Sequence, residues 1–412
     1  MLGSSFTALR WFTDPYTYLD ELSQTRGFSF DLDLPMMGTC FVTGEPQWIE
    51  AVHKNKNLVG GAGTQFLNAV VGNSVITRSG EAHSQKRKAL NPFFYNGDMS
   101  IVDQLTAQRM NEAFKHIKKD SIFSVEEAIE DVTLKVILDF IFGDLDDITY
   151  NSILEAVHGW KTSFKNPLFL FLKPLQVNIS KNWGWGRFLH FRDRLRALIK
   201  GELHTPHFKS RPGFLSDFQK KVGNSWSDDD LAWEVISVLV FGHDTGSVAA
   251  AWWSYHMLKN HCWGTLKNTA EIESSLKEAM RFSPPVVHLT RMAEQDTDLL
   301  EKKIKKGTRV LPCIYLAHHN PAIFENPGQF SPRRFLENKK DLKFSFIPFG
   351  FGDRLCLGKN FAERQMLFVA KGLLDTMDLE LVKPVLRTKR KLVLMAPEGG
   401  TPVRVKKIQS GL

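Results

Sequence analysis

The sequence contains few cysteines, and none of them are arranged as pairs. The four, Cys40, Cys262, Cys313 and Cys356, are widely spaced, and no Cys-x-x-Cys motif is present. This spacing argues against a structural zinc site and against a framework of disulfides. Few and scattered cysteines are typical of reducing compartments, so we expect a cytoplasmic protein with free thiols.

Long hydrophobic runs are also missing. No segment approaches the roughly 18 uninterrupted apolar residues that a membrane-spanning helix needs. The segment 1–10 lacks a charged start followed by an apolar stretch, so the sequence predicts no signal peptide. We therefore expect no transmembrane anchor.

Modules for binding nucleic acid or for carrying electrons are absent as well. The formal net charge is +8, but no compact basic and aromatic module accompanies it, which argues against nucleic acid as a partner. An acidic protein partner explains the positive charge better. No flavin-binding or iron–sulfur segment and no internal repeat is evident. Length alone would allow two or three domains in these 412 residues.

One cysteine lies in an unusual glycine-rich segment. Residues 349–358 read Phe-Gly-Phe-Gly-Asp-Arg-Leu-Cys-Leu-Gly, and a helical pattern begins near Lys359. A thiolate at Cys356 would be stabilised by the helix N-terminus, by the N–H groups of the loop and by any bound metal. The three glycines allow the backbone to approach a large flat group. A free cysteine taken alone is more often a small buried apolar residue.

A second unusual segment lies in the middle of the best-marked helix. Ser227 and the three aspartates after it predict a helix start, and the apolar pattern continues to Lys259. Near its centre stand Gly242, His243, Asp244, Thr245 and Gly246. A carboxylate buried there is unfavourable by several kcal/mol unless another group pairs with it or uses it. The segment therefore indicates a functional site, with a bent helix and a satisfied aspartate as the alternative.

The rest of the chain predicts a mainly helical protein with small sheets. Helical spacing of apolar residues predicts helices at 14–26, 46–53, 100–145, 148–162, 183–200, 270–282 and 359–375 and one starting at Gly80. Strand-like runs occupy 28–32, 39–43, 286–291, 309–315 and parts of 378–405. His83 and Arg87 share one face of the helix that starts at Gly80. By spacing alone, that face is a solvated basic surface.

The Cys356 segment resembles the haem-binding loop of the cytochrome P-450 family, Phe-x-x-Gly-x-Arg-x-Cys-x-Gly, at every specified position. Three further elements of that family occur in the expected order. They are Gly-x-Asp-Thr at 242–245, Glu-x-x-Arg at 278–281 and Phe-x-Pro-x-Arg-Phe at 330–335. The resemblance covers roughly the C-terminal 180 residues, and the N-terminal 200 match weakly. It implies the mainly α fold of that family, an α+β fold in one domain over 1–412.

The resemblance also implies roles for individual residues. Cys356 would be the axial ligand of the iron of haem b, and an axial thiolate donates electron density that favours O–O cleavage. Phe349, Gly350 and Gly358 would form the loop beneath the ring, with Gly352. Four further residues would hold the haem propionates, namely His83, Arg87, Arg291 and Arg354. Glu278, Arg281 and Arg334 would form a buried salt-bridge cluster that braces the loop.

On the other side of the haem, Asp244 and Thr245 resemble the family's acid–alcohol pair. The hydroxyl would relay a proton and the acid would reload it from solvent. Gly242 would widen the helix groove. Three positions depart from the usual pattern: Phe241 replaces Ala or Gly, Gly246 replaces Thr or Ser, and Gln365 replaces Glu. We expect Phe241 to narrow the pocket.

The implied reaction is hydroxylation of a small hydrophobic substrate, such as a terpene, a fatty acid or a steroid, with O2 and two electrons. The electrons would come from a separate ferredoxin or flavodoxin, which a basic patch at Lys86, Lys88 and Lys359 would attract. We expect a monomer. Apolar pocket segments are expected at 66–76, 168–172, 239–241, 286–289 and 399–401. Two alternatives stay open: a peroxide-driven or isomerising haem-thiolate enzyme, and a haem-based ligand sensor or carrier.

Overall fold

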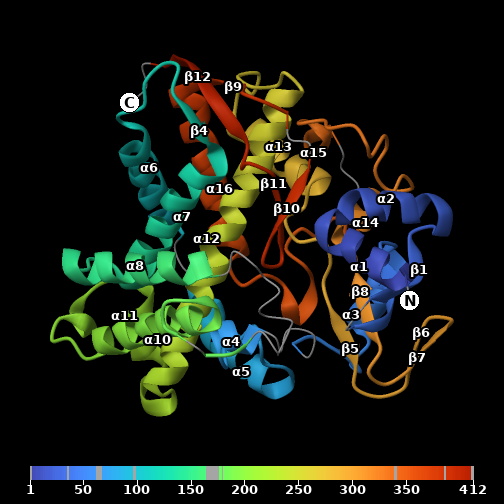
Figure 1. Ribbon diagram of the computed structural model, residues 1–412, viewed down its shortest axis with the longest axis horizontal. Coiled ribbons are helices and arrows are strands. Elements are labelled where there is room, and N and C mark those ends of the chain that lie inside the picture. The colour runs from blue at the N-terminus through green and yellow to red at the C-terminus, as the bar shows by residue number, and fades with distance from the viewer. Residues whose placement is uncertain are drawn as a thin grey trace.

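The structure is a computed structural model that describes residues 2–34, 37–61, 67–95, 99–163, 176–178, 180–337, 341–384 and 387–409. The expected pocket segment 168–172 and residue 66 lie outside these ranges. As predicted, the protein is mainly helical with small sheets (Figure 1). The expectation of a single domain stays a prediction.

Helices form most of the fold. Their bounds are α1 (Leu2–Thr13), α2 (Pro15–Arg26), α3 (Pro46–Lys54), α4 (Asn68–Val71), α5 (Gly80–Phe94), α6 (Ser100–Phe114), α7 (Val125–Phe142), α8 (Asp147–Ser163), α10 (Gly184–Leu203), α11 (Phe214–Val222), α12 (Asp228–Lys259), α13 (Thr269–Phe282), α14 (Ile314–His318), α15 (Arg334–Glu337) and α16 (Lys359–Thr376).

Within the described ranges, the strands form four small sheets. One has five strands in the order β1-β2-β8-β5-β3, and another has three in the order β4-β12-β9. Strands β6 and β7 form a hairpin, and so do β10 and β11. The bounds are β1 (Ser29–Leu34), β2 (Gly38–Thr43), β3 (Leu58–Val59), β4 (Ile122–Ser124), β5 (Arg291–Ala293), β6 (Thr297–Leu299), β7 (Lys302–Ile304), β8 (Arg309–Pro312), β9 (Met377–Leu381), β10 (Thr388–Lys391), β11 (Leu394–Pro397) and β12 (Pro402–Ile408).

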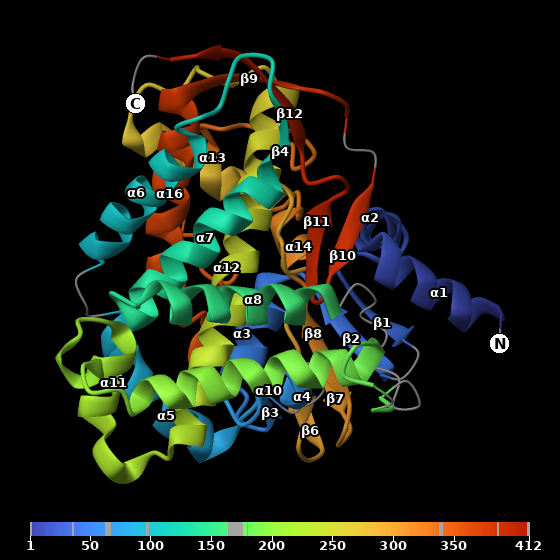
Figure 2. The same ribbon diagram turned by 60° about the vertical axis from the view of Figure 1, so that its left-hand side comes forward.

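Helix α12 runs through the middle of the molecule, and the other elements are arranged around it (Figures 1 and 2). It begins where the sequence predicted, because Ser227 and Asp230 form a capping box. Among the described helices, α12 alone is long and apolar enough to cross a membrane, but 78% of its most apolar stretch is buried inside the protein. It is therefore the core helix of the fold.

The core has a large helical part and two smaller parts near the five-stranded sheet. The large cluster joins α12 to α7, α10, α13 and α16. The smaller clusters pack α2, α3 and α14 against β1, β2 and β8. Figure 1 shows this sheet with α1, α2 and α3 on one side of the molecule and the longer helices on the other.

Several predicted elements differ from the structure. The run 100–145 is two helices, α6 and α7, separated by β4, and Asp120, with a left-handed φ of 66°, lies in the turn between α6 and β4. The predicted strand 286–291 is mostly irregular, since Val286 and His288 bridge to two different partners before β5 begins at Arg291. The predicted strand 309–315 ends at Pro312, where α14 follows. Helix α1 was not predicted.

Candidate functional site

The Cys356 loop is shaped by its own backbone bonds. The N–H of Cys356 donates to the carbonyl of Phe349 at 2.9 Å, and that of Gly350 donates to Ile347 at 2.9 Å. Gly350 and Gly352 have φ values of 78° and 66°, which glycine adopts without strain. Helix α16 then starts at Lys359, as the sequence predicted.

The thiol of Cys356 is surrounded by protein but remains accessible. Burial raises its pKa, while a hydrogen bond from Gly358 and the charge of Arg87 act in the opposite direction. Cys356 is nevertheless exposed to solvent. The loop and helix N-terminus therefore do not produce a thiolate by themselves, and a bound metal would have to supply the remaining stabilisation.

The backbone conformation of Gly358 does not require glycine, unlike those of Gly350 and Gly352. Its φ is −89°, which other residues adopt readily. No described atom lies within 4 Å of the position that a Cβ would occupy there, whereas a Cβ at Gly352 would lie 2.6 Å from Nδ1 of His53. Neither backbone strain nor a protein neighbour explains Gly358. A group bound against the loop would.

A cluster of cations lies next to this loop. Burial and then the charge of Arg354 lower the pKa of His83 to about 4, and Arg87 and Arg291 add to the effect. Burial also lowers the pKa of Arg291, whose guanidinium lies 5.2 Å from the ring centre of Phe351. All four predicted propionate-binding residues thus lie within electrostatic reach of one another. The structure does not place His83 on a solvated face.

The carboxylate of Asp353 faces this cluster but does not match the charge of its three arginines. Asp353 lies 3.8 Å from Nε of Arg354, and its side chain is 70% exposed. Arg354 instead donates to the backbone carbonyl of Gly60 at 2.9 Å and to that of Arg78. Burial lowers the pKa of Arg354 to about 10. Buried arginines that repel one another fit a ligand that brings carboxylates of its own.

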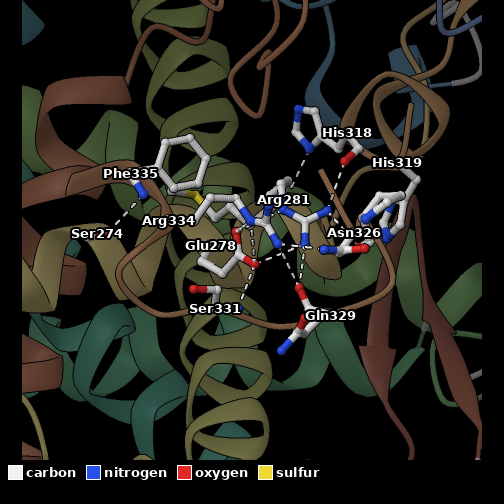
Figure 3. Close-up of polar contacts among 12 residues, drawn as sticks. Ser274, Glu278, Arg281, His318, His319, Asn326, Gln329, Ser331, Arg334 and Phe335 are labelled. Atoms are coloured by element: carbon white, nitrogen blue, oxygen red, sulfur yellow. Dashed lines mark hydrogen bonds and ion pairs between the residues drawn. The ribbon is translucent and has the colours of Figure 1, made fainter. Parts of the chain in front are cut away.

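The predicted salt-bridge cluster is present and buried (Figure 3). Glu278 accepts from Nε of Arg281 at 2.8 Å and from Nε of Arg334 at 3.0 Å, and its carboxylate is completely buried. Arg281 also donates to the carbonyl of His318 at 2.9 Å. The ring of His318 accepts from the N–H of Ile347 at 2.9 Å. The cluster therefore reaches the Cys356 loop through His318, a link that the sequence did not predict.

The acid and the alcohol of α12 have separate partners. Thr245 donates its hydroxyl to the carbonyl of Phe241 at 3.0 Å. Asp244 lies 3.1 Å from Nζ of Lys161 and 3.5 Å from Nζ of Lys391. Burial acts to raise the pKa of Asp244, but the interactions with His243 and both lysines outweigh it and lower the pKa to about 2. At neutral pH the carboxylate is therefore ionised.

Asp244 belongs to an ion network that joins α7, α8, α12 and β10. Lys391 also binds Glu126 at 2.8 Å and Glu130 at 2.6 Å, and Lys161 binds Glu130. The side chains of this network are between 11% and 25% exposed, so the network extends from the core toward solvent. No sequence signal marks Lys161 or Lys391, because both are brought to Asp244 only by the tertiary fold.

The glycines of α12 face protein. A Cβ at Gly242 would lie 3.2 Å from Cδ1 of Ile137 on α7, so the expected widening of a groove is replaced by close packing of two helices. A Cβ at Gly246 would lie 3.2 Å from Oε1 of Gln365. The side chain of Phe241 is partly buried and packs against the large core cluster. Its effect on a pocket stays a prediction.

The predicted basic patch needs a correction. Lys86 is only 12% exposed, lies 2.8 Å from the buried carboxylate of Glu234, and covers the ring of Trp226 at 4.2 Å. The prediction that Lys86 attracts a partner is wrong, because helical spacing alone did not show which face of α5 is buried. Lys88 is exposed and Lys359 is half-buried.

Fold and site together define a helical protein that presents an accessible cysteine thiol beside a cluster of buried cations. A family model described as cytochrome P450 matches residues 2–262 and 261–402. The chain belongs to the cytochrome P450 family, whose members are generally haem-thiolate monooxygenases.

Individual relatives are distant. The Mycobacterium tuberculosis protein named "Putative cytochrome P450 138" is 24% identical over 406 residues, covering 91% of this chain and 88% of the relative. The structure of CYP175A1 from Thermus thermophilus has a TM-score of 0.76 at 22% identity, covering 96% of this chain and 95% of the other. That of the cytochrome P450DA heme domain has a TM-score of 0.82 at 18% identity, covering 97% and 95%. These structures support the fold.

The residues of this chain fit the haem that the family generally binds. Cys356 offers an accessible sulfur, and the unbalanced cations suit two propionates. Gly358 leaves room for a flat group against the loop. These are observations of the chain itself and do not depend on its relatives.

Proposed function

We propose that this protein is a haem-thiolate monooxygenase that hydroxylates a small hydrophobic substrate. The single observation that carries the proposal is the accessible thiol of Cys356 next to the buried Arg291 and Arg354, whose charges the exposed Asp353 balances only in part. Bound there, haem supplies activation of dioxygen. The balanced reaction is R–H + O2 + 2 electrons + 2 protons giving R–OH + H2O. The residues on the two sides of the haem would have different roles in it.

On the Cys356 side, the residues would bind and orient the haem. Cys356 would hold the haem iron through its sulfur, in a loop formed with Phe349, Gly350 and Gly358. His83, Arg87, Arg291 and Arg354 would hold the propionates. The imidazole of His83 would bind a propionate by a hydrogen bond.

On the α12 side, the residues move protons. The hydroxyl of Thr245 would relay a proton, and Asp244 would supply that proton from solvent. A carboxylate with a pKa of about 2 does not store a proton at neutral pH. Asp244 therefore passes on protons that arrive along the network of Lys161, Lys391 and Glu130, which extends toward solvent.

The electrons come from a separate acidic ferredoxin or flavodoxin. This proposal rests on the positive charge of the chain and on the exposed Lys88 and half-buried Lys359 near the Cys356 loop. We propose that the protein acts as a monomer in the cytoplasm. The substrate class is small and hydrophobic, such as a terpene, fatty acid or steroid.

The deciding experiment is spectroscopic. The reduced protein with carbon monoxide should give the absorption band of a thiolate-ligated haem, and Cys356→Ser should abolish it. A protein that binds no haem, or that keeps a histidine-ligated spectrum, would refute the proposal. Turnover with hydrogen peroxide alone that equals turnover with a reductase system would favour the peroxide-driven alternative. Ligand binding without any product would favour a sensor.

A further inference from the structure

Tyr95, which follows the last residue of α5, makes a contact that no sequence motif predicts. Its phenol oxygen lies 2.5 Å from the backbone carbonyl oxygen of Cys356, a residue 261 positions further along the chain. Burial raises the pKa of Tyr95. Since a carbonyl oxygen can only accept, the hydroxyl of Tyr95 is the donor of this hydrogen bond.

This hydrogen bond helps to hold the backbone of Cys356 in place. The N–H of Cys356 donates to Phe349 at 2.9 Å, and its carbonyl also accepts from the N–H of Lys359, at the longer distance of 3.4 Å. Tyr95 provides the shorter of the two bonds to this carbonyl. The direction in which the Cys356 side chain leaves the backbone thus depends on a residue from a distant part of the sequence.

Tyr95 also touches the cation cluster. The guanidinium carbon of Arg87 lies 5.8 Å from the centre of the Tyr95 ring. A side-chain hydrogen bond from Arg87 acts to lower the pKa of Tyr95 against the effect of burial. One aromatic side chain therefore connects a residue of the cation cluster to the cysteine.

We propose that Tyr95 is a positioning residue for the Cys356 thiolate and that its hydroxyl raises the reduction potential of the iron held there. This inference rests on the proposed role of Cys356. The O–H group directs its positive end at the carbonyl next to the sulfur. It therefore favours the reduced state, which carries one more negative charge.

The test is Tyr95→Phe, which keeps the ring beside Arg87 and removes only the hydroxyl. At a fixed potential, the ratio of reduced to oxidised protein should fall three- to tenfold, which is a shift of about 30 to 60 mV for one electron. The carbon monoxide band of the reduced protein should move as well, because the thiolate changes its orientation and charge. Both are measured on the haem-loaded full chain.

Tyr16→Phe is a matched control. The hydroxyl of Tyr16 donates to the carbonyl of Pro284 at 2.7 Å, in a buried position on α2. Its loss should lower the thermal midpoint without moving the potential or the band. If Tyr95→Phe shifts the potential no more than Tyr16→Phe does, the inference is wrong. A wild-type protein without a thiolate band would instead refute the proposed function on which the inference depends.

Discussion

Gln365 on α16 lies directly against Gly246 on α12, so that a Cβ on the glycine would be 3.2 Å from the amide oxygen of Gln365. Gly246 and Gln365 both depart from the pattern of the family, and the fold makes them neighbours. Gln365 is 1% exposed, and neither atom of its amide has a hydrogen-bond partner among the described residues. A buried polar group without a partner destabilises a fold.

Gln365→Met should therefore stabilise the protein. The substitution keeps the length of the side chain and removes the unpaired amide, which gives a gain of about 1 to 2 kcal/mol in the free energy of unfolding. Gln365→Glu is the opposite test, because it adds a buried charge and should lower stability. Urea unfolding measures both. A loss of stability in Gln365→Met would mean that the amide has a partner that the chain does not provide.

Glu278→Gln should be strongly destabilising. The substitution leaves Arg281, which is completely buried, with an uncompensated charge, and breaking such a pair costs about 3 to 5 kcal/mol. Glu50→Gln is a matched control on the surface, since Glu50 and Lys54 are 44% and 71% exposed. The control should change stability by less than about 0.5 kcal/mol. Equal effects in the two variants would contradict a structural role for the buried cluster.

The low pKa of Asp244 predicts how acid affects stability. Its folded-state pKa of about 2 lies below the ordinary value of 3.8, so ionised Asp244 stabilises the fold above about pH 4. This contribution is lost as the pH falls from about 4 to about 2, and it amounts to about 2 kcal/mol. The stability difference between wild type and Asp244→Asn should shrink over that window. A difference that stays constant would show that the carboxylate does not titrate there.

Lys391→Met should disturb the ion network of α12. Three carboxylates lose a partner, so stability should fall by about 1 to 3 kcal/mol, and the pKa of Asp244 should rise because a nearby positive charge is removed. Lys389→Met, at the exposed position of the same strand, should have little effect. Unfolding as a function of pH measures both changes. An unchanged acid response in Lys391→Met would exclude Lys391 as a determinant of the Asp244 charge.

Partner docking can be tested with the corrected basic patch. Reversing the charge at Lys88 and Lys359 should slow reduction by an acidic donor about tenfold at low salt and much less at high salt. Lys86→Glu should reduce stability instead, because it places two carboxylates together in a buried position. Reduction rates measured over a range of ionic strengths distinguish the two effects. Rates that do not depend on these lysines would remove the patch from the docking surface.

Local patterns predicted much of this molecule. The capping box at Ser227, the start of α16 after the Cys356 loop and the arginine pairs of Glu278 all depend on residues that are close in sequence or belong to a specific motif. Local patterns do not predict which face of a helix is buried. Lys86 was misplaced because its partner, Glu234, lies on another helix.

The unpredicted parts of the site are long-range contacts. Lys391 reaches Asp244 from the hairpin of β10 and β11, and Tyr95, which directly follows α5, reaches the carbonyl of Cys356. Neither contact has a spacing that sequence reasoning can recognise, because the fold alone determines it. The same holds for the contact between Gly246 and Gln365.

The link from Arg281 through His318 to Ile347 also has a consequence for how the protein is loaded. It consists of hydrogen bonds between protein groups, so the fold itself restrains the backbone that leads into the Cys356 loop. The loop then loses conformational entropy when the protein folds, so this loss does not weaken the binding of haem. The apoprotein should therefore capture haem in a single fast step, and weakening this link should slow capture even in variants that still fold.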